Sequence, residues 1–196
     1  IFDDRFFGTY IAGYGDGEII DNRIESNVYT NSIFGIAYNS PSLTNGLRIE
    51  NNTIANTFVG VEIYTFWGGI AEDLVLEDNI FIDIHGVGLS MSSSPHTGGT
   101  IRDASLEGND FSASQLPGWD IGPGAMYVGP DGIASNGAPA VTENVHIEVG
   151  EEHFPPGTTA CTQIYDLGVD TIVEVDGDSG ADLGVCFFEP STDDDD

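Results

Sequence analysis

The sequence feature that most constrains the fold is a short motif that returns at regular intervals. It consists of an apolar residue, two variable residues, an asparagine, one variable residue and a second apolar residue. Its copies are IIDNRI at 19–24, IENNTI at 49–54, LEDNIF at 76–81 and LEGNDF at 106–111. The asparagines Asn22, Asn52, Asn79 and Asn109 are separated by 30, 27 and 30 residues. A period of this length predicts one small unit stacked on copies of itself.

Two further patterns extend the repeat. A weaker copy, VTENVH at 141–146, has His146 where the other copies have an apolar residue. A second signature follows the motif as Gly35-Ile-Ala-Tyr38, Gly60-Val-Glu-Ile63, Gly86-Val-Gly-Leu89 and Gly124-Ala-Met-Tyr127. We expect each repeat to hold at least two short strands.

The residues between the motifs favour strands over helices. The chain has 26 glycines and 9 prolines, its apolar residues mostly alternate, and β-branched and aromatic residues fill the short runs. A unit of about 27 to 30 residues is shorter than a propeller blade of roughly 40 and suits one coil of a parallel β-helix. At a bend of such a coil, an inward asparagine can bond the backbone and the same amide one coil away.

The segments IENNTI, LEDNIF and LEGNDF resemble repeats of the pectate-lyase-like parallel β-helix superfamily, which includes NosD-type secreted proteins. The resemblance covers roughly residues 15 to 150. It implies an all-β fold, a right-handed single-stranded parallel β-helix of about five or six coils, with a C-terminal β cap. The superfamily includes polysaccharide lyases, hydrolases, epimerases, tailspikes and adhesins, so the fold does not fix the function.

The expected organisation is a repeat region over residues 1–150 and a cap with an acidic tail over residues 151–196. Strand-like runs at 171–175 and 184–188 flank the turn at 176–180, which predicts a hairpin. Cys161 and Cys186 favour one disulfide that ties this cap, the alternative being two reduced thiols.

The charge balance excludes several classes of partner. Four arginines, no lysine and 33 acidic residues give a net charge of −29. Nucleic acid and anionic bilayers need clustered cations, so neither is expected as a partner. No apolar run reaches 18 residues, which predicts that the chain does not insert into a membrane.

The repeat aligns some of the acidic residues. Alternation predicts that Glu50, Glu77 and Glu107 point outward, in a column with a spacing of about 4.8 Å. Such a column needs screening salt or a divalent cation, so a halophilic surface, bound Ca²⁺ and a catalytic use of the acids all stay open. The acids Asp176, Asp178 and Asp182 resemble part of a Ca²⁺ loop, although an ordinary acidic turn explains them too. No cofactor is required, and Ca²⁺ is the candidate ion.

Loops recur after each glycine-containing strand, and stacking predicts that they form a rim along one edge. This rim would carry Tyr64, Trp67 and His96 beside Glu62. Exposed aromatic rings of this kind bind the apolar faces of sugars, which predicts carbohydrate contact at Tyr64, Trp67 and His96. The alternative is that Trp67 only covers the core beneath its loop.

The best catalytic candidates are Asp83 and His85, with Glu62 from the preceding coil. Together they could perform acid–base chemistry, although Asp83 and His85 also fit an ordinary solvated strand pair. The absence of lysine argues against a lyase that acts on anionic sugars. The histidines have no ligand-like spacing with the cysteines, so the sequence predicts no zinc site.

These features favour a non-catalytic module over an enzyme. We expect an extracellular, structural, adhesive or glycan-contacting β-helical segment of a larger secreted or surface protein. Its partners would be a polysaccharide or a cell-surface glycan, and self-assembly end to end is a further expectation. The alternative is a polysaccharide-active enzyme, for which a glycoside hydrolase is favoured over a lyase.

Overall fold

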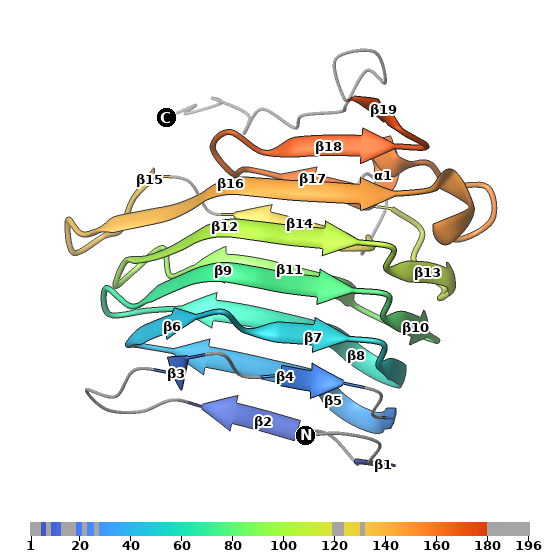
Figure 1. The fold of residues 1–196 in the computed structure, drawn as a ribbon, viewed down its shortest axis with the longest axis horizontal. Coiled ribbons are helices and arrows are strands. Elements are labelled where there is room, and N and C mark those ends of the chain that lie inside the picture. The colour runs from blue at the N-terminus through green and yellow to red at the C-terminus, as the bar shows by residue number, and fades with distance from the viewer. Residues whose placement is uncertain are drawn as a thin grey trace, which may run out of the picture.

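The chain forms a stack of parallel coils. The computed structural model describes residues 5–6, 9–12, 19–20, 23–25, 28–118, 124–129 and 132–179. Each coil places its strands directly above those of the coil before it, from β2 in blue to β18 in red (Figure 1). This arrangement confirms the predicted all-β parallel β-helix.

Two sheets run along the stack within the described residues, nine-stranded and ten-stranded. The first sheet contains β1 (Arg5–Phe6), β2 (Thr9–Ala12), β5 (Val28–Ser40), β8 (Thr53–Thr65), β10 (Ile80–Ile82), β11 (Val87–Ser93), β13 (Asp110–Ala113), β14 (Met126–Gly129) and β17 (Ile164–Asp166). The second sheet contains β3 (Ile19–Ile20), β4 (Arg23–Glu25), β6 (Leu43–Asn45), β7 (Arg48–Glu50), β9 (Ile70–Glu77), β12 (Gly99–Glu107), β15 (Gly132–Ile133), β16 (Pro139–Val149), β18 (Ile172–Val175) and β19 (Asp178–Ser179). In Figure 1 the second sheet lies in front of the first.

The space between the sheets is filled by columns of apolar side chains. Alternation along each strand of the second sheet turns one aliphatic residue per coil inward. One such column is Ile49, Leu76, Leu106, Ile147 and Val173, each at most 5% exposed. Burying one such side chain stabilises the fold by roughly 1.5 to 3 kcal/mol, so every coil extends the core of the one below.

A buried asparagine ladder forms the corner between the two sheets. Asn52, Asn79 and Asn109 are fully buried. Asn52 Nδ2 donates to Asn79 Oδ1 (2.9 Å), and Asn79 Nδ2 donates to Asn109 Oδ1 (3.0 Å). Asn79 Nδ2 also donates to the carbonyl oxygen of Ile49 (2.9 Å), and Asn109 Nδ2 donates to that of Leu76 (2.7 Å). The predicted ladder is therefore confirmed for these three copies.

The first and last copies of the motif were aligned wrongly. Strand pairing places Ile24, not Ile19, beside Ile49, so the matching segment is IESNVY at 24–29; Asn22 itself lies outside the described residues. At the other end, Ile147 pairs with Leu106. Asn144 therefore faces solvent at a left-handed bend (φ 52°), far from the asparagine corner.

A column of small residues lets the first sheet pack closely. The strand register aligns Gly35, Gly60, Gly88 and Ala125. The third and fourth copies of the glycine signature, predicted to start at Gly86 and Gly124, therefore start two residues and one residue too early. The rings of Phe81 and Phe111 stack with 4.5 Å between their centroids and pack against Gly60 and Gly88 of this column. A Cβ on Gly60 would lie 2.6 Å from the Phe81 ring, which explains why a side chain is missing there.

The parallel ladder continues beyond residue 150. After a 3₁₀ turn, η1 (Glu151–His153), and one short helix, α1 (Ala160–Gln163), β17 pairs with β14 and β18 pairs with β16. The strand β19 then turns back antiparallel to β18. Residues 176 and 177, with φ of 53° and 80°, form the tight turn of this hairpin. The run at 184–188 and Cys186 lie outside the described residues, so the disulfide with Cys161 stays a prediction.

Among the described residues, no helix is both long and apolar enough to span a bilayer.

Candidate functional site

The outer face of the first sheet carries a row of polar and aromatic residues. Successive coils align Glu62, Ser90, Tyr127 and Tyr165. The rings of Tyr127 and Tyr165 stack 5.7 Å apart and within 8° of parallel. Burial, and to a smaller extent the neighbouring Tyr165, raises the pKa of the Tyr127 hydroxyl. The sheet thus presents a flat aromatic pair two coils away from a half-buried carboxyl group.

Stacked loops border this face, as the recurrence of loops in the sequence predicts. The N–H of Ser94 donates to the carbonyl oxygen of Thr65 (2.8 Å), and the N–H of Trp67 donates to Thr97 Oγ1 (3.0 Å). On the other side, the N–H of Ser135 donates to the carbonyl oxygen of Pro95 (3.1 Å). Three loops, 66–69, 94–98 and 134–138, therefore form one continuous edge, which we call the rim.

The rim holds an aromatic cluster of Tyr64, Phe66 and Trp67. The Tyr64 and Phe66 rings lie 5.9 Å apart and nearly parallel, and the Phe66 and Trp67 rings meet edge to face at 4.9 Å. Trp67 is 67% exposed and has a left-handed backbone (φ 54°). Such exposure disfavours the reading in which Trp67 covers the core. Sequence reasoning missed Phe66, although it stands next to Trp67.

His96 lies on the next loop of the rim and is exposed. The Ser94 hydroxyl oxygen accepts the N–H of His96 (3.3 Å) and that of Thr97 (3.1 Å), which fixes the turn. Ser135 Oγ donates to the carbonyl oxygen of His96 (3.1 Å) from the loop above. The backbone beneath the imidazole is therefore held on both sides.

The three residues predicted to act together in catalysis occupy two separate places. Asp83 and His85 lie at the bend before β11, where His85 Nε2 is 3.2 Å from Asn56 Oδ1. Asp83 has a left-handed backbone (φ 51°), so strand alternation does not apply to this segment. Glu62 instead pairs with Ser90, seven residues after Asp83. The bend and Glu62 therefore do not form one acid–base group.

Glu62 lies two residues before Tyr64 on the outward side of β8. Partial burial raises the pKa of its carboxyl group above the ordinary value. A carboxyl group with a raised pKa next to aromatic rings can donate a hydrogen bond to a hydroxyl when it is protonated.

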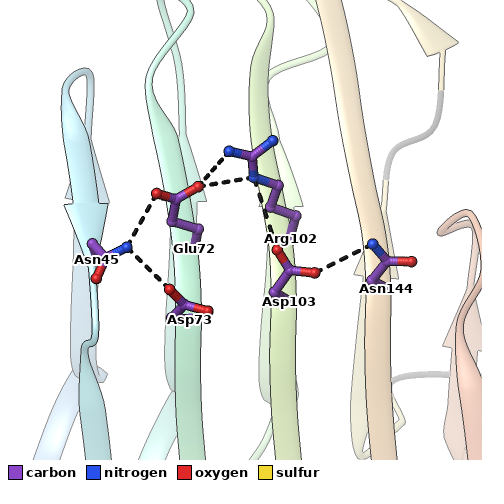
Figure 2. Close-up of polar contacts among 6 residues, drawn as sticks. All are labelled: Asn45, Glu72, Asp73, Arg102, Asp103 and Asn144. Atoms are coloured by element: carbon purple, nitrogen blue, oxygen red, sulfur yellow. Dashed lines mark hydrogen bonds and ion pairs between the residues drawn. The ribbon is translucent and has the colours of Figure 1, made fainter.

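The outer face of the second sheet carries a polar network that crosses four coils (Figure 2). Arg102 binds Glu72 through both Nε (2.9 Å) and a terminal nitrogen. Asn45 Nδ2 donates to Glu72 Oε1 and to Asp73 Oδ2, both at 3.1 Å. The Arg102 hydrogen bond and then that of Asn45 lower the pKa of Glu72.

The same network continues to the next coil. Asn144 Nδ2 donates to Asp103 Oδ1 (3.2 Å), and Asp103 lies 3.9 Å from Arg102 Nε. Asp73, Asp103 and Asn144 all have a left-handed backbone, with φ between 52° and 54°. An open surface cavity of about 560 Å³ lies beside these residues.

A glutamate ladder runs parallel to this network. Strand pairing confirms the predicted column of Glu50, Glu77 and Glu107 and extends it to six coils. Its members in register are Glu25, Glu50, Glu77, Glu107, Glu148 and Glu174. Glu50 is only 5% exposed and accepts a hydrogen bond from Arg48 Nε (2.9 Å).

Comparison with family models identifies the repeat. The model of the family described as "Right handed beta helix region" matches residues 1–146. The chain belongs to the right-handed β-helix family. Comparison with curated proteins and with solved structures gives no significant match. The family establishes the hand and the repeat of this right-handed β-helix, and its function has to be argued from the surface.

Of the acids predicted to form a Ca²⁺ loop, Asp176 and the backbone of Asp178 lie at the β18–β19 hairpin. Asp176 is exposed at the hairpin turn between β18 and β19. The side chain of Asp178 and all of Asp182 lie outside the described residues, so this site stays a prediction.

Proposed function

We propose that this right-handed β-helix is a non-catalytic glycan-contacting module of a larger secreted or surface protein. The observation that carries the proposal is the aromatic cluster on the rim, in which the exposed ring of Trp67 packs beside the half-buried rings of Phe66 and Tyr64. Indole and phenol rings offer flat apolar faces to the C–H faces of sugars, and exposed apolar patches mark interaction sites. The fixed backbone of the rim limits the conformational entropy that binding would cost.

The charge of the chain selects the class of glycan. With a net charge of −29, the protein repels polyanionic sugars such as polyuronates. The described arginine side chains, Arg48 and Arg102, lie on the second sheet and are paired with Glu50 and Glu72. No cation on the described part of the rim offsets this repulsion, so the proposed ligand is a neutral polysaccharide.

The test compares Trp67→Ala with a matched exposed aromatic variant, Phe58→Ala. Phe58 is 58% exposed on β8 and lies outside the rim. Affinity electrophoresis and calorimetry would use soluble β-glucan, xylan and galactomannan as neutral probes, with polygalacturonate as the anionic comparison. Loss of one stacked ring is expected to weaken binding of the preferred neutral probe by about tenfold or more, with Phe58→Ala unchanged.

Two results would contradict the glycan proposal. The first is a wild-type chain that binds none of the neutral probes. The second is equal binding by the Trp67→Ala and wild-type chains, which would place the contact elsewhere.

A polysaccharide hydrolase is the second candidate, favoured by the raised pKa of Glu62 beside Tyr64. Glycoside hydrolysis uses two carboxyl groups at about 5 to 9.5 Å, whereas Ala37 and Ser90 are the strand neighbours of Glu62. Reducing-sugar release that Glu62→Gln abolishes, with binding retained, would support the hydrolase over the binding module.

A further inference from the structure

Two adjacent coils bring together a histidine and two glutamates that are distant in sequence. His146 and Glu148 are two residues apart on β16, so both point outward from the second sheet. Glu174 on β18 pairs directly with Glu148. A ligand atom from each of the three residues lies within 4.8 Å of those of the other two. This cluster lies on the outer face of the second sheet and shares no residue with the rim.

The geometry suits a divalent transition metal. Zn²⁺ bonds of about 2.1 Å to imidazole nitrogen and carboxylate oxygen separate tetrahedral ligand atoms by about 3.4 Å. His146 Nε2 lies 3.8 Å from Glu174 Oε1, close to that separation. Half-exposed and exposed side chains can rotate by the remaining distance without moving the strands.

From this convergence we infer that His146, Glu148 and Glu174 form a Zn²⁺-type metal site. One imidazole and two carboxylates give three protein ligands, which leaves a fourth position open for water or for a group of another molecule. The imidazole selects a transition metal, because Ca²⁺ and Mg²⁺ prefer oxygen ligands only. The parallel β-ladder holds the backbones of all three residues in fixed register, so binding requires only side-chain rotation.

Local charge supports metal binding. Glu107 extends the glutamate ladder beside Glu148, while the strand neighbours of His146 are the uncharged Ser105 and Ile172. A bound dication would offset the repulsion between the two carboxylates. A protonated His146 paired with Glu174 is the competing arrangement, and it requires no metal.

The experiment measures Zn²⁺ binding by calorimetry near pH 7 in a non-coordinating buffer, with Ca²⁺ as the comparison ion. The test variants are His146→Gln and Glu174→Gln. Their matched controls are His85→Gln, an exposed histidine at the bend between β10 and β11, and Glu77→Gln, a ladder member two coils below Glu148. Circular dichroism verifies that each variant folds.

The site predicts that both test variants bind Zn²⁺ at least about tenfold more weakly than the wild type, while both controls retain its affinity. In NMR spectra, Zn²⁺ should shift the side-chain nitrogen resonances of one of the four histidines, and His146→Gln should remove that signal. Three results would overturn the site: no Zn²⁺ binding, undiminished binding by His146→Gln, or equal affinity for Ca²⁺. None of them bears on glycan binding at the rim.

Discussion

The asparagines of the buried corner each satisfy several polar groups that the turn would otherwise leave unpaired. Asn79 is the middle member of the ladder. Its Nδ2 donates twice, and its Oδ1 accepts both the N–H and the Nδ2 of Asn52. Hydrogen bonds in such a chain polarise one another, and an unpaired buried group costs about 1 to 3 kcal/mol.

Asn79→Ala is therefore expected to lower the free energy of unfolding by about 3 kcal/mol, because it leaves buried donors and acceptors on both neighbouring coils. Urea unfolding followed by circular dichroism measures the change. Asn144→Gly is the control, because it removes one exposed hydrogen bond to Asp103 while glycine tolerates the left-handed backbone (φ 52°), so it should cost under about 1 kcal/mol. Equal losses in the two variants would contradict a structural role for the ladder.

A second residue-scale prediction concerns Asp166, which is 7% exposed. Burial raises the pKa of its carboxyl group, while hydrogen bonds from the Gly168 N–H and the Thr171 hydroxyl partly offset the effect. The folded chain thus holds this proton more tightly than the unfolded chain. The stabilisation is fully present below the unfolded pKa and is lost as the pH rises through the raised folded pKa.

Asp166→Asn keeps an oxygen that can accept both hydrogen bonds and removes the titration. We expect the melting temperature of this variant to fall less than that of the wild type as the pH rises from about 4 to 7. Asp170→Asn, an equal charge change at an exposed position, should keep the wild-type slope. Identical slopes for Asp166→Asn and the wild type would refute this assignment.

At the scale of the strand and the corner, the sequence predicted the central coils well and the outer ones poorly. The three inner motifs align because their coils differ only slightly in length. From Ile24 to Ile49 the coil takes 25 residues, and from Leu106 to Ile147 it takes 41. Loop length is not fixed by the core, so only strand pairing could reveal the true register.

The candidate sites differ in the same way in how far the sequence could predict them. The rim was predictable because loops recur at one phase of every coil, which places Trp67 next to the loop of His96. The cluster of His146 and Glu174 was not, since its members meet only through the pairing of β16 with β18. Glu62, Asp83 and His85 failed to converge because left-handed Asp83 bends the chain.

The glycine column gives a prediction at the element scale. Gly60→Ala places a methyl group against the carbonyl oxygen of Gly88 and the Phe81 ring, so the coils above and below have to separate. We expect a loss of about 2 kcal/mol in unfolding free energy. Thermal unfolding would compare it with Ser90→Ala, an outward position on the neighbouring strand. An unfolding free energy of Gly60→Ala equal to that of the wild type would contradict this prediction, because it would mean that the coils can accommodate the methyl group.

For the molecule as a whole, charge repulsion along the stack opposes folding. Glu77 stands between Glu50 and Glu107, and like charges directly opposite on neighbouring strands are destabilising. Glu77→Gln should therefore raise stability by roughly 0.5 kcal/mol at low salt. In about 1 M NaCl, where the screening length is about 3 Å, the gain should vanish.

The melting temperature of the wild-type chain itself should rise with salt. If screening is the cause, monovalent salt alone is sufficient to raise the melting temperature. If millimolar Ca²⁺ raises it more than NaCl of the same ionic strength, the chain has specific ion sites. A gain for Glu77→Gln that persists in 1 M NaCl would contradict the repulsion argument. Calorimetric scans at matched ionic strength distinguish these cases.

Coil size varies at some corners and not at others. The next strand begins four positions after the inward residue of the second sheet at each of Ile49, Leu76 and Leu106. Across the rim, by contrast, Ile70 comes five positions after Thr65, and Thr100 comes seven positions after Ser93. The molecule is thus a stack of rings with constant thickness and adjustable perimeter. A peptide grafted into a rim loop would project sideways and leave the height of the stack unchanged.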